Sequence, residues 1–255
     1  MIAAALRSRP APMVFGVATI IVAAAAIEGL IRAGAINRFV VPLPSEVMLS
    51  FARVVVEEDV AARFLTTFGE ALMAGALVAA IGVPMGVLLY TFASVRKATE
   101  SWVAGLAAAP IVLMYPLFLV IWGRSALTII MMAAVSGLPA VILKTLEGLR
   151  GVRPVLINVG RSFKLGPAQL FSRILFPAAV PTIFVGLRLG MIFALINVVG
   201  VEFLINFGGL GQLINELAER YDLPGTYVAT CFVILVSAIY VILLERIERW
   251  LRPAG

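Results

Sequence analysis

The sequence predicts an all-α polytopic membrane protein with six transmembrane helices, and three observations carry that prediction. First, 62% of the 255 residues are hydrophobic and only 13% are charged, whereas about a quarter of the residues of a soluble domain are charged. Second, the chain contains apolar stretches of the roughly 20 residues that a membrane-spanning helix requires. Third, basic residues gather in segments between those stretches, as the positive-inside rule predicts.

The first expected span covers residues 13 to 31, and its apolar run is too long for a cleaved signal peptide. Pro42 and Pro44 then interrupt any helix, and Ser45 with Glu46 after it can start a new one. The apolar residues of this short helix share one face, so we expect it to lie along the membrane surface. They are Val47, Phe51, Val54 and Val55.

The second expected span, residues 64 to 92, carries small residues at a spacing that lets helices approach closely. These are Ala71, Gly75, Ala79, Gly82 and Gly86. The third span, residues 101 to 122, is interrupted by Pro110 and Pro116. The stretch WGRSA at its end is expected to form a tight turn. The remaining spans are expected at residues 127 to 146, 179 to 205 and 226 to 244.

Six spans place both chain termini on the same side of the membrane. With that side in the cytoplasm, 13 of the 20 basic residues face inward and 6 face outward, and Arg188 lies inside the fifth span. We therefore predict cytoplasmic N- and C-termini and one transmembrane domain over residues 1–255. Its cytoplasmic loop covers about residues 150–177, and its periplasmic segments cover about residues 34–62 and 206–224.

Several classes of chemistry are excluded by composition. The chain has no histidine, which removes His-ligated metals and His-dependent catalytic triads. Its one cysteine, Cys231, lies in an apolar run and is interpreted as a packing residue. No lysine follows a glycine, so the phosphate loop that hydrolyses ATP is missing, and we expect no cofactor or metal in this chain. The net charge of +6 follows from topology and does not indicate nucleic-acid binding.

The loop between the fourth and fifth spans is long for a connection between packed helices, which suggests a function. Pro154 can begin a helix, Gly166-Pro167 divides the loop, and Pro177 is expected to stop the second piece. We therefore expect two short helices beneath the membrane. Two interpretations fit them: a basic hairpin that touches anionic membrane lipid, or a docking surface for a soluble partner.

This loop resembles the EAA loop of ABC-transporter permeases that work with a periplasmic binding protein. When the pattern of that loop is aligned on Pro177, its Ile and Leu fall on Ile174 and Phe176. Its Glu-Ala-Ala then falls on residues 158–160, which read Asn-Val-Gly, and its glycine falls on Lys164. The C-terminal half of the pattern fits, and the N-terminal half departs from it at the Glu, at the second Ala and at the Gly.

Other stretches resemble the nitrate/sulfonate/taurine branch of these permeases. They are VPLPSEVM, PIVLMYPLFLVIWG, FPAAVPTIFVGLRLG and VVGVEFLINFGGLGQLI. The resemblance implies a type I importer in a bacterial inner membrane, in which two permease copies, expected to be identical, form the pore. It further implies two ATPase subunits that bind ATP and Mg, and a periplasmic or lipid-anchored binding protein that delivers a small anionic solute.

The resemblance also implies where the functional residues lie. The ATPase-coupling segment comprises Asn158, Val159, Gly160, Arg161, Ser162, Phe163, Lys164, Leu165, Gly166 and Pro167. Val159, Phe163 and Leu165 are expected to insert into an ATPase cleft, with Arg161 and Lys164 at its rim. Candidates for the pathway or gate are Met114, Tyr115, Phe118, Asn197 and Glu202.

Simpler roles stay open for the pathway candidates. Met114, Tyr115 and Phe118 can serve ordinary packing, and Asn197 can bond a neighbouring helix. Glu202 can line the gate, contact the binding protein, or pair with Arg220 or Arg124.

Two other functions compete with the importer. An ATPase-independent secondary transporter or channel needs paired charges in the membrane, and only Glu70, Arg188 and Glu202 are available. A membrane enzyme is disfavoured by the lack of histidine and of a carboxylate cluster.

Overall fold

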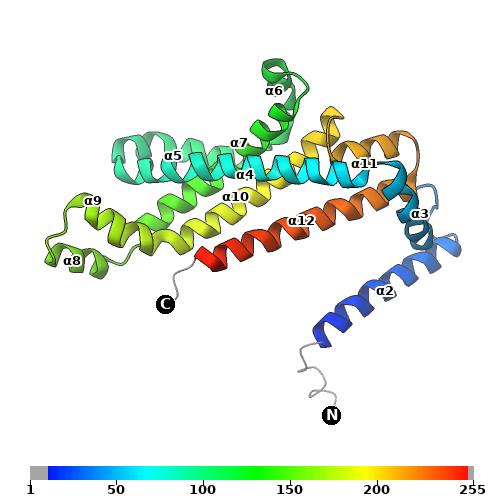
Figure 1. The fold of residues 1–255 in the computed structure, drawn as a ribbon, viewed down its shortest axis with the longest axis horizontal. Coiled ribbons are helices and arrows are strands. Elements are labelled where there is room, and N and C mark those ends of the chain that lie inside the picture. The colour runs from blue at the N-terminus through cyan, green and yellow to red at the C-terminus, as the bar shows by residue number, and fades with distance from the viewer. Residues whose placement is uncertain (1–10, 252–255) are drawn as a thin grey trace, which may run out of the picture. The chain divides into compact units, whose positions relative to one another are not determined.

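A computed structural model describes residues 11 to 251, with side chains from residue 14 to residue 249. This part of the chain is helical (Figure 1). Its elements are α2 (Ala11–Arg32), α3 (Pro44–Glu57), α4 (Val60–Thr91), α5 (Ala93–Ala108), η1 (Ile111–Met114), α6 (Tyr115–Trp122), α7 (Ala126–Arg150), α8 (Pro154–Ser162), α9 (Pro167–Leu170), η2 (Phe171–Leu175), α10 (Phe176–Ile205), α11 (Leu210–Glu219) and α12 (Leu223–Leu251).

Five stretches within these residues are long and apolar enough to cross a membrane, and α5 with η1–α6 forms a sixth, bent candidate. The predicted all-α polytopic fold is therefore confirmed. The third span was predicted at residues 101 to 122. In the structure it begins at Ala93, and its two helical parts, which meet between Ala108 and Ile111, are bent by 93°. A residue before proline is disfavoured in the helical region, and Ala109, which precedes Pro110, is extended with ψ of 135°.

Contacts divide the chain into two compact units. In the unit formed by residues 11–60 and 213–231, α2 contacts α3. The carboxylate of Glu28 in α2 accepts hydrogen bonds from the backbone N–H of Ser45 at 3.2 Å and from its hydroxyl at 3.0 Å. α3 begins at Pro44, one residue before the predicted start, because proline is well suited to the first turn of a helix.

Two ion pairs tie α3 to the turn between α11 and α12. Arg53 Nη2 lies 2.6 Å from Asp222 Oδ2, and Arg220 Nη1 lies 2.7 Å from Glu58 Oε1. The neighbouring carboxylate of Asp222 raises the pKa of the Arg53 guanidinium. Arg53 therefore stays charged throughout the physiological pH range, and its ion pair with Asp222 connects α3 to the turn before α12.

The second unit, residues 61–212 and 232–251, packs α4, α7 and α10 around small residues. A Cβ on Gly190 of α10 would lie 2.7 Å from the carbonyl oxygen of Gly137 in α7. A Cβ on Gly82 of α4 would lie 2.8 Å from a methyl carbon of Val141. The helices approach this closely because glycine has no side chain. Gly82 is one of the small residues predicted to allow close approach in the second span. Figure 1 shows α7 and α10 side by side.

The prediction that Pro177 ends a helix is wrong. α9, η2 and α10 follow one another without a break, and Pro177 is the second residue of α10. Proline lacks an N–H and its ring crowds the carbonyl four residues earlier. η2 is a single π turn, in which Phe176 N–H bonds to the carbonyl of Phe171, five residues earlier. The backbone hydrogen bonds have therefore already left the α-helical pattern before Pro177, and the helix continues through the proline.

Candidate functional site

The predicted coupling segment forms a defined helix and a defined turn. α8 begins at Pro154, where a missing N–H costs no helical hydrogen bond. At its end, Lys164 N–H donates to the Arg161 carbonyl at 2.9 Å and Leu165 N–H donates to the Gly160 carbonyl at 3.2 Å. These two bonds form a Schellman motif, which needs a left-handed residue after the helix. Lys164 is that residue, with φ of +53°.

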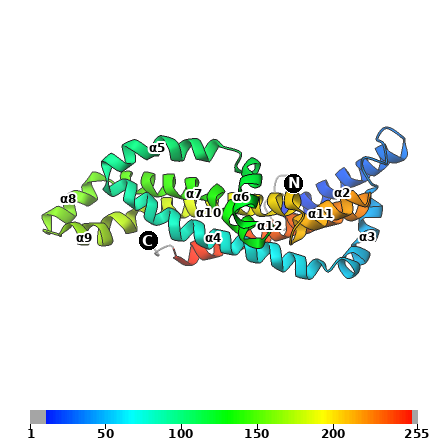
Figure 2. The same ribbon diagram turned by 90° about the horizontal axis from the view of Figure 1, so that it is seen from above.

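Gly160 holds α8 against the next turn of chain. It is buried, and a Cβ there would lie 2.5 Å from Leu170 Cδ1 and 2.6 Å from Ile174 Cδ1. At both distances a larger residue would push aside the ends of the Leu170 and Ile174 side chains. Gly160 therefore lets α8 lie close against α9 and η2, beside the end of α7 and the start of α10 (Figures 1 and 2).

The outer face of α8 is an apolar stripe. Val155, Val159 and Phe163 follow at intervals of four residues, which places them on one helix face, and 68%, 46% and 76% of their surfaces are exposed. Exposed Arg161 and Lys164 lie next to the stripe in the sequence. This stripe of three residues is called the α8 stripe below.

The other members of the predicted segment support the helix and the turn. Ser162 Oγ donates to the Asn158 carbonyl at 3.0 Å, and Pro167 begins α9 after Gly166. Leu165, predicted to insert into an ATPase cleft, is only partly exposed and packs near Gly160. Val155 was missed by sequence reasoning, although its spacing from Val159 and Phe163 could have identified it.

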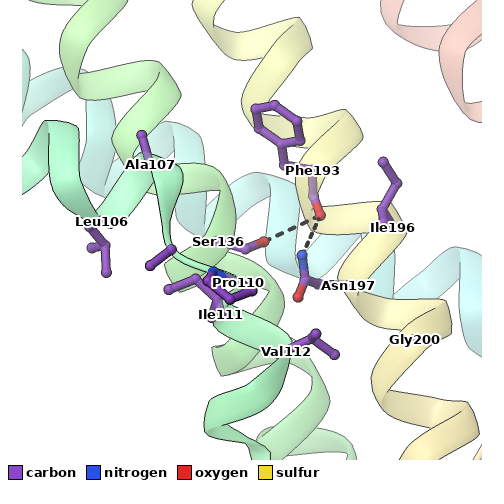
Figure 3. A pocket seen from close by; sticks show the side chains of 11 residues that line it. Leu106, Ala107, Pro110, Ile111, Val112, Ser136, Phe193, Ile196, Asn197 and Gly200 are labelled. Carbon is purple, nitrogen blue, oxygen red and sulfur yellow. Dashed lines mark hydrogen bonds between the residues drawn. The ribbon is translucent and has the colours of Figure 1, made fainter.

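A cavity of about 390 Å³ lies where the third span bends (Figure 3). The end of α5, the bend itself, α7 and α10 line it. Its lining residues are Leu106, Ala107, Ala109, Pro110, Ile111, Val112, Ser136, Phe193, Ile196, Asn197 and Gly200. This volume lies within the range of small-molecule pockets. We call it the bend cavity.

Only Asn197 among the predicted pathway residues lines the bend cavity. Tyr115 packs against the core and Phe118 is buried in it, with its ring 5.3 Å from that of Trp122. Met114 is exposed at the end of η1. Ser136 of α7, which the sequence did not single out, adds a second polar side chain to the wall.

One backbone carbonyl organises the polar wall of this cavity. Asn197 Nδ2 donates to the Phe193 carbonyl at 3.1 Å, and Ser136 Oγ lies 3.2 Å from the same oxygen and 2.7 Å from the Ala133 carbonyl (Figure 3). Asn197 Oδ1 is buried and has no hydrogen-bond partner. This oxygen is covered by protein, so it lies beneath the surface of the bend cavity and not on its wall.

Glu202 is placed in a separate buried cluster at the end of α10. It is 0% exposed and accepts hydrogen bonds from the Thr67 hydroxyl at 2.9 Å and from Gly211 N–H at 2.8 Å. A Cβ on Gly209 would collide with Thr67 and Glu202, so glycine is required there. The geometry supports a structural role for Glu202, in which it fixes the segment after α10.

The two arginines that were considered as partners of Glu202 bind elsewhere. Arg124 donates to the backbone carbonyl of Asn206, and Arg220 pairs with Glu58. Arg188 lies 3.8 Å from Glu248. Glu70, which is 5% exposed, neighbours Glu202.

Residues 71–253 match the family described as the binding-protein-dependent transport system inner membrane component. A probable ABC transporter permease of Brucella melitensis biotype 1 is 27% identical over 190 residues, which cover 74% of this chain and 77% of the relative. A putative aliphatic sulfonates permease of Bacillus subtilis is 26% identical and covers 73% of this chain and 67% of its own length. A nitrate import permease of Synechocystis is 27% identical, and the match covers 69% of this chain and 64% of the relative.

The fold is similar to a solved importer. A chain of the inward-facing MetNI methionine ABC transporter superimposes with a TM-score of 0.65 at 20% identity, and the match covers 74% of this chain and 94% of that one. Together with the family match, this similarity identifies the architecture as that of type I ABC importer permeases. The chain belongs to the family of binding-protein-dependent transport system inner membrane components, and it is a multi-pass ABC transporter permease.

Proposed function

We propose that this chain is the pore-forming subunit of an ATP-driven importer and that α8 couples it to a separate ATPase subunit. The single observation that carries the coupling role is the α8 stripe, an exposed apolar face on a helix that Gly160 fixes to its neighbours. Large exposed apolar side chains gathered on one face are typical of protein interaction sites. Basic Arg161 and Lys164 next to them suit a partner surface with acidic residues at its rim.

The chain itself explains how a movement of α8 would reach the membrane. α8 packs through Gly160 onto Leu170 and Ile174, and η2 continues directly into α10. A push on α8 is therefore transmitted to α10, which carries Asn197 at the bend cavity and Glu202 near its far end. ATPase closure would move these packed elements as rigid bodies and switch the direction in which the pore opens.

We further propose the assembly that the family resemblance implies. Two copies of this chain form the pore, two ATPase subunits bind ATP and Mg, and a periplasmic or lipid-anchored binding protein delivers the solute. The distribution of basic residues supports cytoplasmic termini and a cytoplasmic α8. The sulfonate and nitrate permeases among the relatives support a small solute of the sulfonate, taurine or nitrate kind.

An ATPase-independent transporter is the alternative function, and the described charges give it little support. Such a protein needs charges that can bind and release an ion along a pathway. Arg188 is engaged with Glu248 at 3.8 Å, and Glu202 is enclosed by hydrogen bonds from Thr67 and Gly211. Glu70 is buried beside Glu202.

The coupling role is tested by co-purification from membranes of the native host. We expect the tagged wild-type chain to retain an ATPase subunit and Phe163→Asp to lose it while still inserting in the membrane, because the variant places a charge in the α8 stripe. Phe39→Asp is the matched control, since Phe39 is also exposed, at 89%, and lies far from α8 in the sequence. Equal ATPase recovery with Phe163→Asp and Phe39→Asp would show that α8 is not the dock.

A further inference from the structure

Two buried carboxyl groups meet where the segment after α10 turns back on α4. Glu202 is 0% exposed and Glu70 is 5% exposed, and the two carboxyl groups lie within hydrogen-bonding reach of each other. Both reach the same turn of the chain, because a Cβ on Gly208 would lie 3.7 Å from Glu70 Oε1 and a Cβ on Gly209 would collide with Glu202 Oε1. Two negative charges this close together and out of water repel each other strongly. The pair therefore requires a balancing positive charge.

No basic side chain supplies that charge within the part of the chain that the structure describes. Besides Glu70, the groups that bond to Glu202 are the Thr67 hydroxyl and Gly211 N–H. A divalent metal ion also fits poorly, because Ca²⁺ takes about six to eight oxygen ligands and Mg²⁺ an octahedron of them. Both oxygens of Glu202 already accept hydrogen bonds, and the Thr67 oxygen accepts from Leu210 N–H at 2.8 Å. A proton is the cation that this geometry can hold.

The distribution of donors shows which carboxyl group carries the proton. Glu202 accepts from the Thr67 hydroxyl at 2.9 Å and from Gly211 N–H at 2.8 Å, which is the arrangement that an ionised carboxylate requires. Neither oxygen of Glu70 has a hydrogen-bond partner among the described residues when both groups are treated as acceptors. An ionised Glu70 would thus be buried without any donor, which is costly. A protonated Glu70 instead has an O–H that can donate to Glu202.

We propose that Glu70 and Glu202 form a proton-binding site, in which Glu70 is the neutral acid and donates its O–H to the ionised carboxylate of Glu202. The proton replaces a repulsion between two charges with a charge-assisted hydrogen bond, which is one of the stronger kinds. Together with the bond from Thr67, this hydrogen bond fastens the turn after α10 to α4. Glu70, Glu202 and Thr67 are all buried, so the proton serves the packing of the chain and not transport.

Infrared spectroscopy of the purified full-length chain in detergent at neutral pH tests the proposal directly. A protonated carboxyl group gives a C=O stretching band that an ionised carboxylate lacks. We expect this band in the wild type, a shift of the band in D₂O, and its loss in Glu70→Gln. Glu57→Gln is the matched control and should keep the band, because 59% of the Glu57 side chain is exposed. A wild type without the band, or an equally strong band in Glu70→Gln, would overturn the proposal.

Thermal unfolding of the same samples tests which carboxyl group is the acid. Glu70→Gln should melt close to the wild type, because an amide N–H can donate to Glu202 in place of the O–H. Glu202→Gln should melt at a lower temperature, because its NH₂ group would face the Thr67 hydroxyl or Gly211 N–H, which are also donors. The reverse order of stability, or a Glu70→Gln chain that does not fold, would contradict the assignment of the proton to Glu70.

Added Ca²⁺, added Mg²⁺ and the chelator EDTA distinguish a proton from a metal ion in the same unfolding measurement. The proposal predicts that each additive changes the melting temperatures of the wild type and Glu70→Gln equally. A metal ion that stabilises the wild type but not Glu70→Gln would overturn the proton-binding site. The importer function is judged separately, by whether the ATPase co-purifies with the wild-type chain, and neither result decides the other.

Discussion

The Thr67 hydroxyl of α4 lies 2.9 Å from a carboxylate oxygen of Glu202 in α10, and it donates a hydrogen bond to that carboxylate. The same hydroxyl accepts from Leu210 N–H at 2.8 Å. One buried side chain thus joins two membrane helices to the start of α11. Because all three groups are buried or partly buried, no water is at hand to replace either bond.

Thr67→Val should therefore destabilise the protein. The substitution keeps the shape of the side chain but leaves Glu202 and Leu210 N–H each short of a partner, which costs about 1–3 kcal/mol per group. Thermal unfolding in detergent measures the effect, and a lowered melting temperature is expected. The control is Thr66→Val, since Thr66 is exposed and its hydroxyl bonds only to the Ala62 carbonyl of its own helix. Equal melting temperatures for the two variants would show that the Thr67 bond contributes nothing.

Gly160→Ala should weaken coupling. A methyl group at Gly160 would lie 2.5 Å from Leu170 Cδ1 and 2.6 Å from Ile174 Cδ1, so these side chains must repack and the contact of α8 with η2 is loosened. ATPase activity stimulated by solute is expected to fall, while ATPase binding through the α8 stripe persists in part.

Gly166→Ala provides the matched control for that change. It lies in the same loop with φ of −66°, and a Cβ there meets nothing within 4 Å. This variant should couple like the wild type, and normal coupling in Gly160→Ala would contradict the proposed transmission through η2.

Lys164→Gly should stabilise the turn after α8, and Lys164→Val should destabilise it. Lys164 has φ of +53°, a conformation that costs a residue with a side chain about 1–2 kcal/mol and is easy for glycine. The melting temperature should therefore rise in Lys164→Gly and fall in Lys164→Val. Lys164→Asn separates backbone from charge, because asparagine tolerates this conformation but is neutral. A normal ATPase affinity in Lys164→Asn would mean that the lysine charge does not take part in docking.

Asp222→Ala should cost more than Asp222→Asn. The carboxylate pairs with Arg53 at 2.6 Å, and its other oxygen accepts from Gly225 N–H at 3.0 Å near the start of α12. The hydrogen bond from Gly225 N–H caps the start of α12. Asparagine keeps this bond, whereas alanine loses it, at a cost of about 1 kcal/mol. The ion pair is partly exposed and worth at most about 1 kcal/mol.

The pH dependence of the Asp222 variants follows from Arg53. Its pKa is raised by Asp222, so its contribution to stability is complete below the unfolded pKa and is lost only as the pH rises above the folded value. Since both values lie in strongly alkaline solution, the stability difference between wild type and Asp222→Asn should be constant from about pH 6 to pH 9. A difference that shrinks within this range would contradict the assignment.

Most spans could be predicted from length and hydrophobicity alone, because the bilayer requires about 20 apolar residues whatever they pack against. The bend of the third span was signalled only as an interruption at Pro110. Its angle of 93° depends on how α5 and α6 pack against α7, which no local pattern contains. The predicted helix end at Pro177 was wrong because the π turn at residues 171–175, which lets the helix continue, cannot be recognised from the types of its residues.

The candidate site was predicted unevenly for a similar reason. Lys164 stands where the resembled loop has glycine, and its left-handed backbone supports the alignment that was anchored on Pro177. Thr67 and Ser136 were missed, since a single hydroxyl in an apolar helix has no periodic signal. Their importance arises from partners that are distant in sequence, Glu202 for Thr67 and Phe193 for Ser136.

The most direct test of the account is solute uptake into proteoliposomes that contain the chain with its co-purifying ATPase and binding protein. The account predicts uptake that requires ATP on the side of α8 and that is lost in Phe163→Asp but retained in Phe39→Asp. Uptake that continues without ATP and follows an imposed ion gradient, unaffected by Phe163→Asp, would contradict it.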